Sequence, residues 1–239
     1  MRFLLIGRGR MGTLVEKTAL SGGDTVVAAL GHEDLGRLGE LGKCADVVVD
    51  FSSPAALGPV VEYVKATATP YLSGVTGLSQ DQLTLLRSAG AAAPVLWSAN
   101  FSLGVAVFCR ILSQVSSTLL PDFDVEITET HHNKKADAPS GTAKLLLQAL
   151  DPDHTLTPVY GREGLCGPRK SGEVGIHALR GGTVAGTHTV HFFGTDEELE
   201  ITHRAASRQI FASGAYHVAR LLPAMPAGVY DLQDILFGK

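Results

Sequence analysis

The sequence predicts an α/β protein, with an N-terminal doubly wound parallel sheet and a second α+β domain that carries an open mixed sheet. Three observations predict this class. Short continuous apolar runs alternate with helical patterns through residue 102, a glycine-rich turn follows the first run, and period-two alternation replaces the runs further along the chain. Continuous runs indicate strands buried on both faces, whereas alternation indicates half-buried strands.

The first part of the chain alternates between strand and helix patterns. One helix is expected over Gly12–Ala19, a second begins after Ser53-Pro54, and a third begins at the Ser79–Gln82 capping box. Strands interleaved with helices in this way build a doubly wound sheet. The predicted strands are Arg2–Ile6, Thr25–Leu30, Ala45–Phe51, Tyr71–Ser73 and Pro94–Trp97.

The pattern of the later chain is different. Leu103–Leu120 is a long apolar helix pattern that Pro121 ends, and Asp124–His131 alternates as a half-buried strand does. Gly186–Phe193 and Glu198–His203 alternate on either side of a glycine turn, which predicts an antiparallel hairpin.

These patterns predict two domains. We expect residues 103–208 to form a substrate-binding and oligomerisation domain, and residues 1–102 plus 209–239 to form a dinucleotide-binding domain. The closing helix pattern Gly214–Leu222 and the segment Val229–Phe237 can return to the first domain. Gly161–Gly175 is predicted to be a basic, glycine-rich loop long enough to be mobile.

Composition limits the classes of partner. The 239 residues are 45% hydrophobic and 18% charged with a net charge of −4, so no global basic field is available for nucleic acid or an anionic membrane. The three cysteines form no metal-spaced pair, and the apolar run after Met1-Arg2 is too short for a signal segment or a membrane span. We therefore expect a cytoplasmic protein.

The first candidate site is the turn after the first strand. Gly7-Arg8-Gly9-Arg10-Met11-Gly12 fits G-x-G-x-x-G, with a strand before it and a helix after it. Such glycines permit a tight turn, let a diphosphate approach the backbone and let helix and strand pack closely. We interpret the turn as a dinucleotide site rather than a purely structural turn.

The residues that would read the cofactor ribose leave two alternatives open. An acid at the end of the second strand favours NAD, and a basic side chain there favours NADP. Glu33 could accept a hydrogen bond from the ribose, whereas His32 or Arg37 could face a 2′-phosphate. The cofactor is thus predicted only as NADH or NADPH.

The second candidate site is Glu129–Ala143, which contains two histidines and two lysines just before a helix start. A metal site is not expected, because His131 and His132 would point to opposite faces of a strand. A solvated polar loop is the other simple interpretation. The helix that follows argues against it, because Ser140 is a plausible N-cap there.

This helix start can hold an anion. The amides of Gly141 and Thr142, with the Thr142 hydroxyl, can face a carboxylate at the helix N-terminus. A molecule held there would be within reach of His131, His132 and Lys135, which can supply protons and positive charge. The segment therefore predicts an enzyme that acts on a small acidic substrate.

These residues resemble the dihydrodipicolinate reductase (4-hydroxy-tetrahydrodipicolinate reductase) family of the route to diaminopimelate and lysine. The resemblance extends in order over nearly the whole chain, and the run from His131 to Ala143 is its most specific part. Its other parts are Gly7–Gly12, Asp50–Pro54, Gly74–Gly77, Asn100–Val105, Gly161–Gly164, Leu199–Ala205, Ser207-Arg208 and Phe211–Ala215.

The resemblance implies a Rossmann domain, an α+β domain whose open sheet builds a homotetramer, and hydride transfer from NADH or NADPH to a cyclic unsaturated dicarboxylate. It places His131 as proton donor and Lys135 as companion donor, with His132, Gly141 and Thr142 binding substrate. The strand-end loops Gly74, Val75, Thr76 and Ser98, Ala99, Asn100, Phe101 match those that contact the nicotinamide half of the cofactor.

Three departures accompany the resemblance. The glycine turn is one residue shorter than in many relatives, Val75 replaces a common threonine, and Gly31-His32 stand where relatives often have an acid or an acid–arginine pair. Only the third bears on cofactor preference. Two other functions are considered: another Rossmann-type oxidoreductase acting on an amino acid or semialdehyde, and a non-catalytic NAD(P)-sensing protein.

Overall fold

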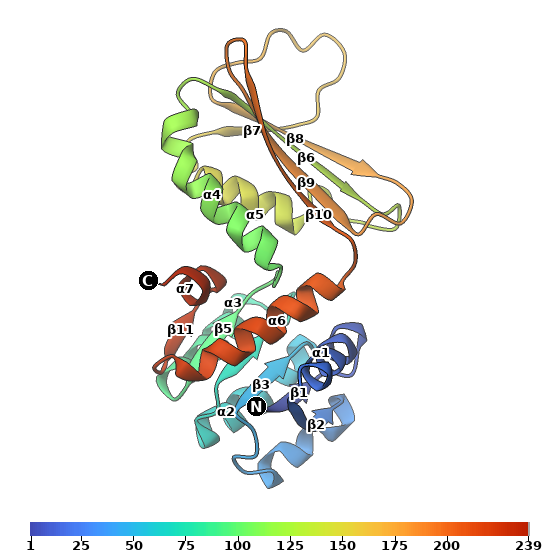
Figure 1. Cartoon of the computed structure of the whole chain (residues 1–239), viewed down its shortest axis with the longest axis vertical. Coiled ribbons are helices and arrows are strands. Elements are labelled where there is room, and N and C mark those ends of the chain that lie inside the picture. Colours follow the sequence, from blue (N-terminus) through green and yellow to red (C-terminus); the bar gives the residue numbers. More distant parts are fainter. Residues whose placement is uncertain (239) are drawn as a thin grey trace. The chain divides into compact units, whose positions relative to one another are not determined.

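The computed structural model describes residues 1–238, and the chain divides into two compact units (Figure 1). Unit 1 comprises Met1–Ser102 and the segment from Gln209 onward, and unit 2 comprises Leu103–Arg208. Within the described residues, no helix combines the length and apolar character that crossing a bilayer requires. Each unit is built around its own sheet.

Unit 1 contains a six-stranded sheet whose strand pairs are all parallel, in the order β11-β5-β4-β3-β1-β2. The predicted doubly wound sheet is confirmed, although the third strand is shorter than expected. The strands are β1 (Arg2–Ile6), β2 (Thr25–Leu30), β3 (Val47–Asp50), β4 (Tyr71–Ser73), β5 (Pro94–Trp97) and β11 (Gly228–Tyr230).

Helices cover both faces of this sheet. One face packs its apolar side chains, such as Leu4 and Val48, against α2 and α3, and α1 lies beside α6 (Figure 1). The predicted capping box at Ser79 is present, because the Gln82 amide donates to Ser79 Oγ at 3.2 Å. The helices are α1 (Arg10–Ser21), α2 (Leu57–Thr67), α3 (Gln80–Ser88), α6 (Gln209–Leu221) and α7 (Leu232–Phe237), with 3₁₀ segments over His32–Glu40, Pro54–Ala56, Ala89–Ala91 and Leu222–Ala224.

Unit 2 contains a five-stranded sheet in the order β10-β9-β6-β8-β7, and the predicted mixed sheet is confirmed. Alternate residues of β6 are buried from Val125 to His131, so one face of this strand belongs to the core. The predicted hairpin is confirmed by the antiparallel pairing of β9 and β10. The elements are α4 (Leu103–Leu119), β6 (Asp124–His131), α5 (Gly141–Leu150), β7 (Thr157–Tyr160), β8 (Glu173–Arg180), β9 (Gly186–Phe193) and β10 (Glu198–Ala205).

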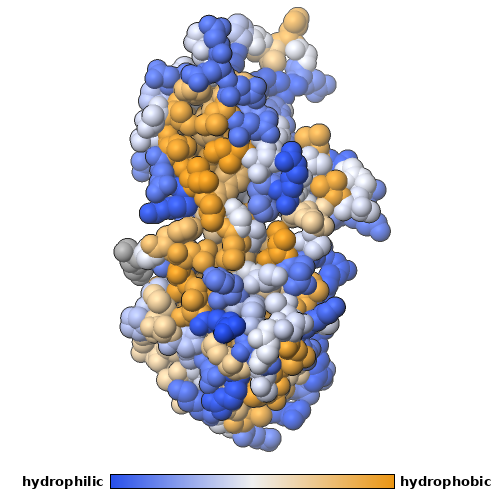
Figure 2. Space-filling view, viewed as in Figure 1, coloured by the Kyte–Doolittle hydropathy of each residue, from blue (hydrophilic) through white to orange (hydrophobic). Residues whose placement is uncertain are grey.

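Both helices of unit 2 pack on the same face of its sheet. Phe108 and Leu112 of α4, and Leu146 of α5, join one apolar cluster with Val125 and Ile127 of β6. The opposite face of the sheet has no helix of this unit on it. Apolar side chains also reach the surface over α4 (Figure 2).

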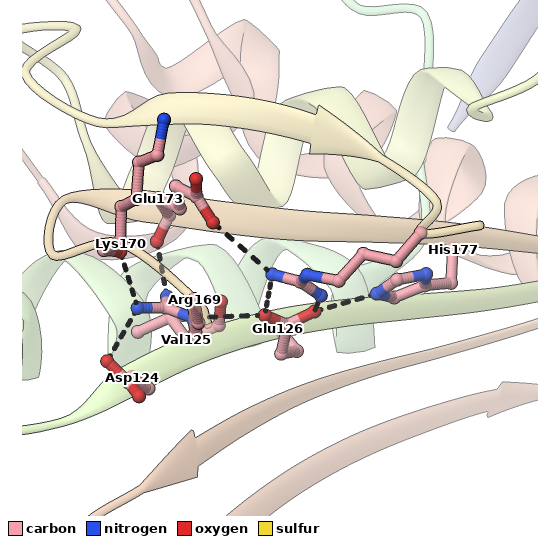
Figure 3. A network of polar contacts seen from close by, with 8 residues as sticks. Asp124, Val125, Glu126, Arg169, Lys170, Glu173 and His177 are labelled. Carbon is pink, nitrogen blue, oxygen red and sulfur yellow. Dashed lines mark hydrogen bonds and ion pairs between the residues drawn. The ribbon is translucent and has the colours of Figure 1, made fainter. Parts of the chain in front are cut away.

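The segment predicted as a loop over Gly161–Gly175 ends earlier, because β8 begins at Glu173. Two arginine side chains of the segment form hydrogen bonds with β6. Arg162 donates two hydrogen bonds to the Glu126 carboxylate, at 2.8 and 2.9 Å, and Arg169 donates a third at 3.2 Å. Figure 3 shows Glu126 between Arg169 and His177, whose Nε2 lies 2.7 Å from Glu126 Oε2.

Candidate active site

The carboxyl ends of the unit 1 strands form an edge at which the chain changes its winding direction. In the order β2-β1-β3, this change falls between β1 and β3. Ligands of open α/β sheets bind outside the strand ends at such a point. Gly7 follows β1 there and Phe51 follows β3, with the Phe51 amide donating to the Ile6 carbonyl at 2.9 Å. The glycine turn therefore lies where the topology favours a ligand.

The three glycines of the turn have different surroundings. Gly7 has a φ of +98°, and a β-carbon on Gly12 would lie 1.9 Å from the Gly7 carbonyl oxygen. A β-carbon on Gly9 would meet nothing within 4 Å. Gly9 is the N-cap of α1, whose first turn contains no acidic residue. Gly7 thus permits the tight turn, Gly9 leaves the backbone open, and Gly12 allows close packing. This arrangement fits the approach of a diphosphate to the helix N-terminus.

The other residues of this turn differ in exposure. Arg8 and Arg10 are exposed and Met11 is half-buried. Arg8 is already engaged, because its Nε donates to the Ala29 carbonyl at 2.8 Å and its Nη1 lies 3.1 Å from Asp34 Oδ2. The ribose-reading region thus holds a paired arginine and acid. This pairing does not distinguish NADH from NADPH as the cofactor.

The two strand-end loops predicted to contact the nicotinamide half follow β4 and β5. Gly74 allows close packing, since a β-carbon there would lie 2.2 Å from the Phe51 ring. Val75 and Phe101 are 1% and 2% exposed, so their side chains belong to the core and only their backbone could face a ligand. The remaining predicted residues are exposed at Thr76 and Ala99 and half-buried at Gly74, Ser98 and Asn100.

In unit 2 the alternation of β6 puts Glu129 and His131 on the core face of the sheet. The strand register then places Arg180 of β8 beside His131, and His188 of β9 beside Glu129. His131 Nδ1 lies 2.6 Å from Glu129 Oε2, and Arg180 donates to both Glu129 oxygens at 2.8 Å. The His131 and His188 rings meet edge to face, with centroids 5.1 Å apart.

The same cluster contacts the start of α5. The Ser140 amide donates to Glu129 Oε1 at 2.9 Å, and Ser140 Oγ accepts from the Ala143 amide at 3.1 Å as the predicted N-cap. Ser140 Oγ also lies 2.9 Å from His188 Nε2. A β-carbon on Gly141 would meet nothing within 4 Å, so the helix begins with an uncovered backbone.

Lys135 and His132 lie in the loop between β6 and α5. Lys135 Nζ donates to Asp137 Oδ1 at 2.8 Å, and the Asp137 carbonyl accepts from Arg180 at 2.6 Å. The His132 amide donates to the Val184 carbonyl at 2.8 Å. His132 Nδ1 is buried and has no hydrogen-bond partner within the described residues.

Burial and neighbouring charge separate the protonation states of this cluster. Burial, followed by the charge of His131, lowers the pKa of His188 to about 4, so His188 is neutral near pH 7. Burial alone would raise the pKa of Glu129, but hydrogen bonds from Arg180, His131 and Ser140 hold it below its usual value. The site therefore contains an ionised carboxylate beside a neutral imidazole.

Sequence reasoning missed three members of this cluster. Glu129 lies inside the candidate segment Glu129–Ala143 but has no predicted role, and no sequence pattern indicates Arg180 or His188. Alternation from His131 back to Glu129 is a signal that could have found the carboxylate. The other two depend on strand register, which a single sequence does not specify.

One group of described residues could hold a metal ion, and it does not include the adjacent histidines. His191, Glu198 and Glu200 bring ligand atoms within 4.8 Å of one another on β9 and β10, with both glutamates exposed. Exposed acidic groups of this kind are common without an ion. No role in the site around His131 follows from it.

A doubly wound sheet with an open glycine turn, together with a unit that carries a histidine–carboxylate cluster, defines a nicotinamide-dependent oxidoreductase. Comparison with known families specifies it further. The N-terminal model of dihydrodipicolinate reductase matches residues 1–101, and the C-terminal model matches residues 104–236. The chain belongs to the dihydrodipicolinate reductase family.

Curated relatives support this membership over their full length. The 4-hydroxy-tetrahydrodipicolinate reductase of Staphylococcus aureus is 39% identical over 244 residues, covering 98% of this chain and 100% of the relative. That of Campylobacter jejuni is 39% identical over 233 residues, covering 96% of each. As a member of this family, the chain is a 4-hydroxy-tetrahydrodipicolinate reductase, which uses NADH or NADPH in the route to diaminopimelate and lysine.

A solved structure shares the fold. The dipicolinate-bound dihydrodipicolinate reductase of Paenisporosarcina sp. TG-14 superimposes with a TM-score of 0.79, covering 99% of both chains at 23% identity. The similarity extends over both units of the chain. It confirms the predicted fold class.

Proposed function

We propose that this chain reduces 4-hydroxy-tetrahydrodipicolinate to tetrahydrodipicolinate with His131 as the proton donor. Replacing the 4-hydroxyl group by hydrogen consumes one hydride and one proton and releases water. The bound NADH or NADPH supplies the hydride. A side chain that supplies the proton must lie beside the substrate, and the cluster of His131, Glu129 and the start of α5 carries this proposal.

The proposed substrate cradle is the first turn of α5. Gly141 leaves the backbone uncovered there, and the helix N-terminus is positive. We assign Gly141 and Thr142 to a substrate carboxylate and His132 to substrate binding. Lys135, which donates to Asp137 at 2.8 Å in the same loop, is assigned as companion donor from its position four residues after His131 in the family's motif.

The proposed cofactor-binding residues all follow strands of the unit 1 sheet. The glycine turn is proposed to bind the diphosphate, and the loops after β4 and β5 to bind the nicotinamide half. Because Val75 and Phe101 are buried, their contribution would come from backbone groups alone. Unit 1 is thus proposed as the dinucleotide-binding domain and unit 2 as the substrate-binding domain.

We also propose a homotetramer and a cytoplasmic location. The helix-free face of the unit 2 sheet supports the first, since Leu179 and Phe193 are 52% and 40% exposed in this sheet. Three free cysteines and a place in amino-acid biosynthesis support the second.

The proposed roles predict the effect of two substitutions. His131→Gln and Lys135→Ala should each lower kcat by about 10²–10⁴-fold, because a positioned proton donor contributes that much. Dissociation constants for NADH and NADPH, from nucleotide fluorescence, should stay within about twofold of wild type. The measurement is oxidation of each nucleotide with freshly made substrate.

Matched controls are available in the chain. Lys134→Ala removes the exposed neighbour of Lys135, and His217→Gln changes an exposed histidine of α6. Both should leave turnover unchanged. Full activity of either His131→Gln or Lys135→Ala would refute the role assigned to that residue, and absence of turnover by wild type with both nucleotides would refute the proposed function.

A further inference from the structure

Glu129 binds four hydrogen-bond donors although its side chain is fully buried, with 0% exposure. Oε2 faces His131 Nδ1 at 2.6 Å and Arg180 Nη1 at 2.8 Å. Oε1 accepts from Arg180 Nη2 at 2.8 Å and from the Ser140 amide at 2.9 Å. Each oxygen of this carboxylate therefore accepts two hydrogen bonds.

This arrangement determines which nitrogen of His131 carries a hydrogen. An ionised carboxylate can only accept hydrogen bonds, so Nδ1 of His131 must be the donor in their contact. The neutral ring then has its hydrogen on Nδ1, and Nε2 is the atom that gains and loses the transferred proton. The glycine at 186 keeps Nε2 approachable, since a β-carbon there would lie 3.1 Å from it.

The carboxylate also connects the histidine to the start of α5. Ser140 is held by its amide on Glu129 and caps α5 with its hydroxyl. Arg180 closes the arrangement by pairing with Glu129 and donating to the Asp137 carbonyl, on the residue that binds Lys135. The buried Glu129 carboxylate thus contacts both the proposed proton donor and the segment that forms the proposed cradle.

We propose that Glu129 is a positioning residue for the reduction: it holds His131 in the Nδ1-protonated form with Nε2 as the proton-transferring atom, and it fixes this ring relative to the first turn of α5. Glu129 itself does not touch the substrate. This inference rests on the proposed role of His131.

Glu129→Gln tests the proposal because an amide has one acceptor and one donor. Its oxygen is expected to stay at the Oε1 position, where the donors of Ser140 and Arg180 converge. Its NH₂ group then faces His131 Nδ1 and forces that nitrogen to accept, which moves the ring hydrogen to Nε2 and disfavours the doubly protonated ring. A histidine held in the wrong tautomer lowered kcat by about 10⁴-fold in a serine protease.

The expected result has two parts. In Glu129→Gln, kcat should fall by about 10²–10⁴-fold while KM and nucleotide affinity stay within about twofold. In ¹⁵N NMR of the full chain, the neutral ring of His131 should be protonated at Nδ1 in wild type and at Nε2 in the variant. A merely structural role would lower kcat without changing the tautomer.

Glu126→Gln is the matched control. Glu126 is on the same strand and is also bonded to arginine, but it lies on the opposite face of the sheet. This variant should keep wild-type kcat and the Nδ1-protonated signal of His131.

The test separates two failures. An active His131→Gln enzyme would refute the proposed function itself, whereas an inactive His131→Gln enzyme with a fully active Glu129→Gln enzyme would refute only the positioning role. If Glu129→Gln does not fold, the wild-type spectrum still decides, because a neutral His131 protonated at Nε2 overturns the proposal.

Discussion

Two glutamates of β6 show how one residue type serves two purposes on the opposite faces of one strand. Glu129 is on the core face and contacts His131, whereas Glu126 is on the opposite face and binds Arg162, Arg169 and His177 (Figure 3). Each carboxylate is paired with arginine. For Glu129, whose side chain is fully buried, removal of the arginine would be costly, because the carboxylate would stay buried without compensation.

The pairing of Glu126 predicts how stability depends on pH. Burial alone would raise the pKa of Glu126, but hydrogen bonds from Arg162, His177 and Arg169 lower it from 4.5 to about 2. Because the folded-state pKa is depressed, the stabilisation is present above the unfolded value and is lost as pH falls from about 4.5 to about 2. Screening by solvent around the exposed Arg162 keeps the contribution below the roughly 3 kcal/mol that a shift of this size would correspond to.

Urea unfolding of wild type and Glu126→Gln between pH 7 and pH 2 measures this contribution. The difference in unfolding free energy should be greatest above pH 5 and should shrink toward pH 2. A difference that stays constant over this range would show that the carboxylate charge of Glu126 does not contribute.

At the scale of elements, the sequence predicted best where the period of the pattern was clear. Four of the strands in unit 1 agree with the predicted bounds, because continuous apolar runs are specific to buried parallel strands. The 3₁₀ helix over His32–Glu40 and the strands β7 and β8 were missed. β7 contains Pro158 and is an edge strand, and β8 contains Gly175, so both resemble loop sequence.

Gly175 illustrates why a single sequence could not show the rest. It lies opposite Glu126 in the β6–β8 register, and a β-carbon there would lie 1.7 Å from Glu126 Oε2. The glycine makes room for a carboxylate 49 residues earlier in the chain, which no local pattern reveals. The position of Arg180 in the site depends on the same register, and that of His188 depends on the β6–β9 register.

The candidate site itself was partly predictable. Local spacing identified His131, Lys135 and the Ser140 cap, since these residues are neighbours along the chain. Val75 and Phe101 stay predicted cofactor contacts, but burial of both side chains leaves only their backbone groups for that role. The burial of a residue in a strand-end loop depends on tertiary contacts with other segments, which local sequence does not reveal.

At the scale of the whole molecule, the helix-free sheet of unit 2 predicts assembly. The open face of this mixed sheet exposes the apolar side chains of Leu179 and Phe193, which a further layer would bury. We expect light scattering of the full chain to give the mass of four chains. A monomer at all concentrations would contradict the proposed tetramer.

The account depends most on the convergence of His131, Lys135 and the first turn of α5 on one substrate. A crystal structure of the full chain with NADH and pyridine-2,6-dicarboxylate tests this directly. The account predicts one carboxylate of the inhibitor on the amides of Gly141 and Thr142, with His131 Nε2 within hydrogen-bond distance of the bound molecule. An inhibitor bound away from the start of α5, or a His131 ring whose Nε2 points away from it, would contradict the account.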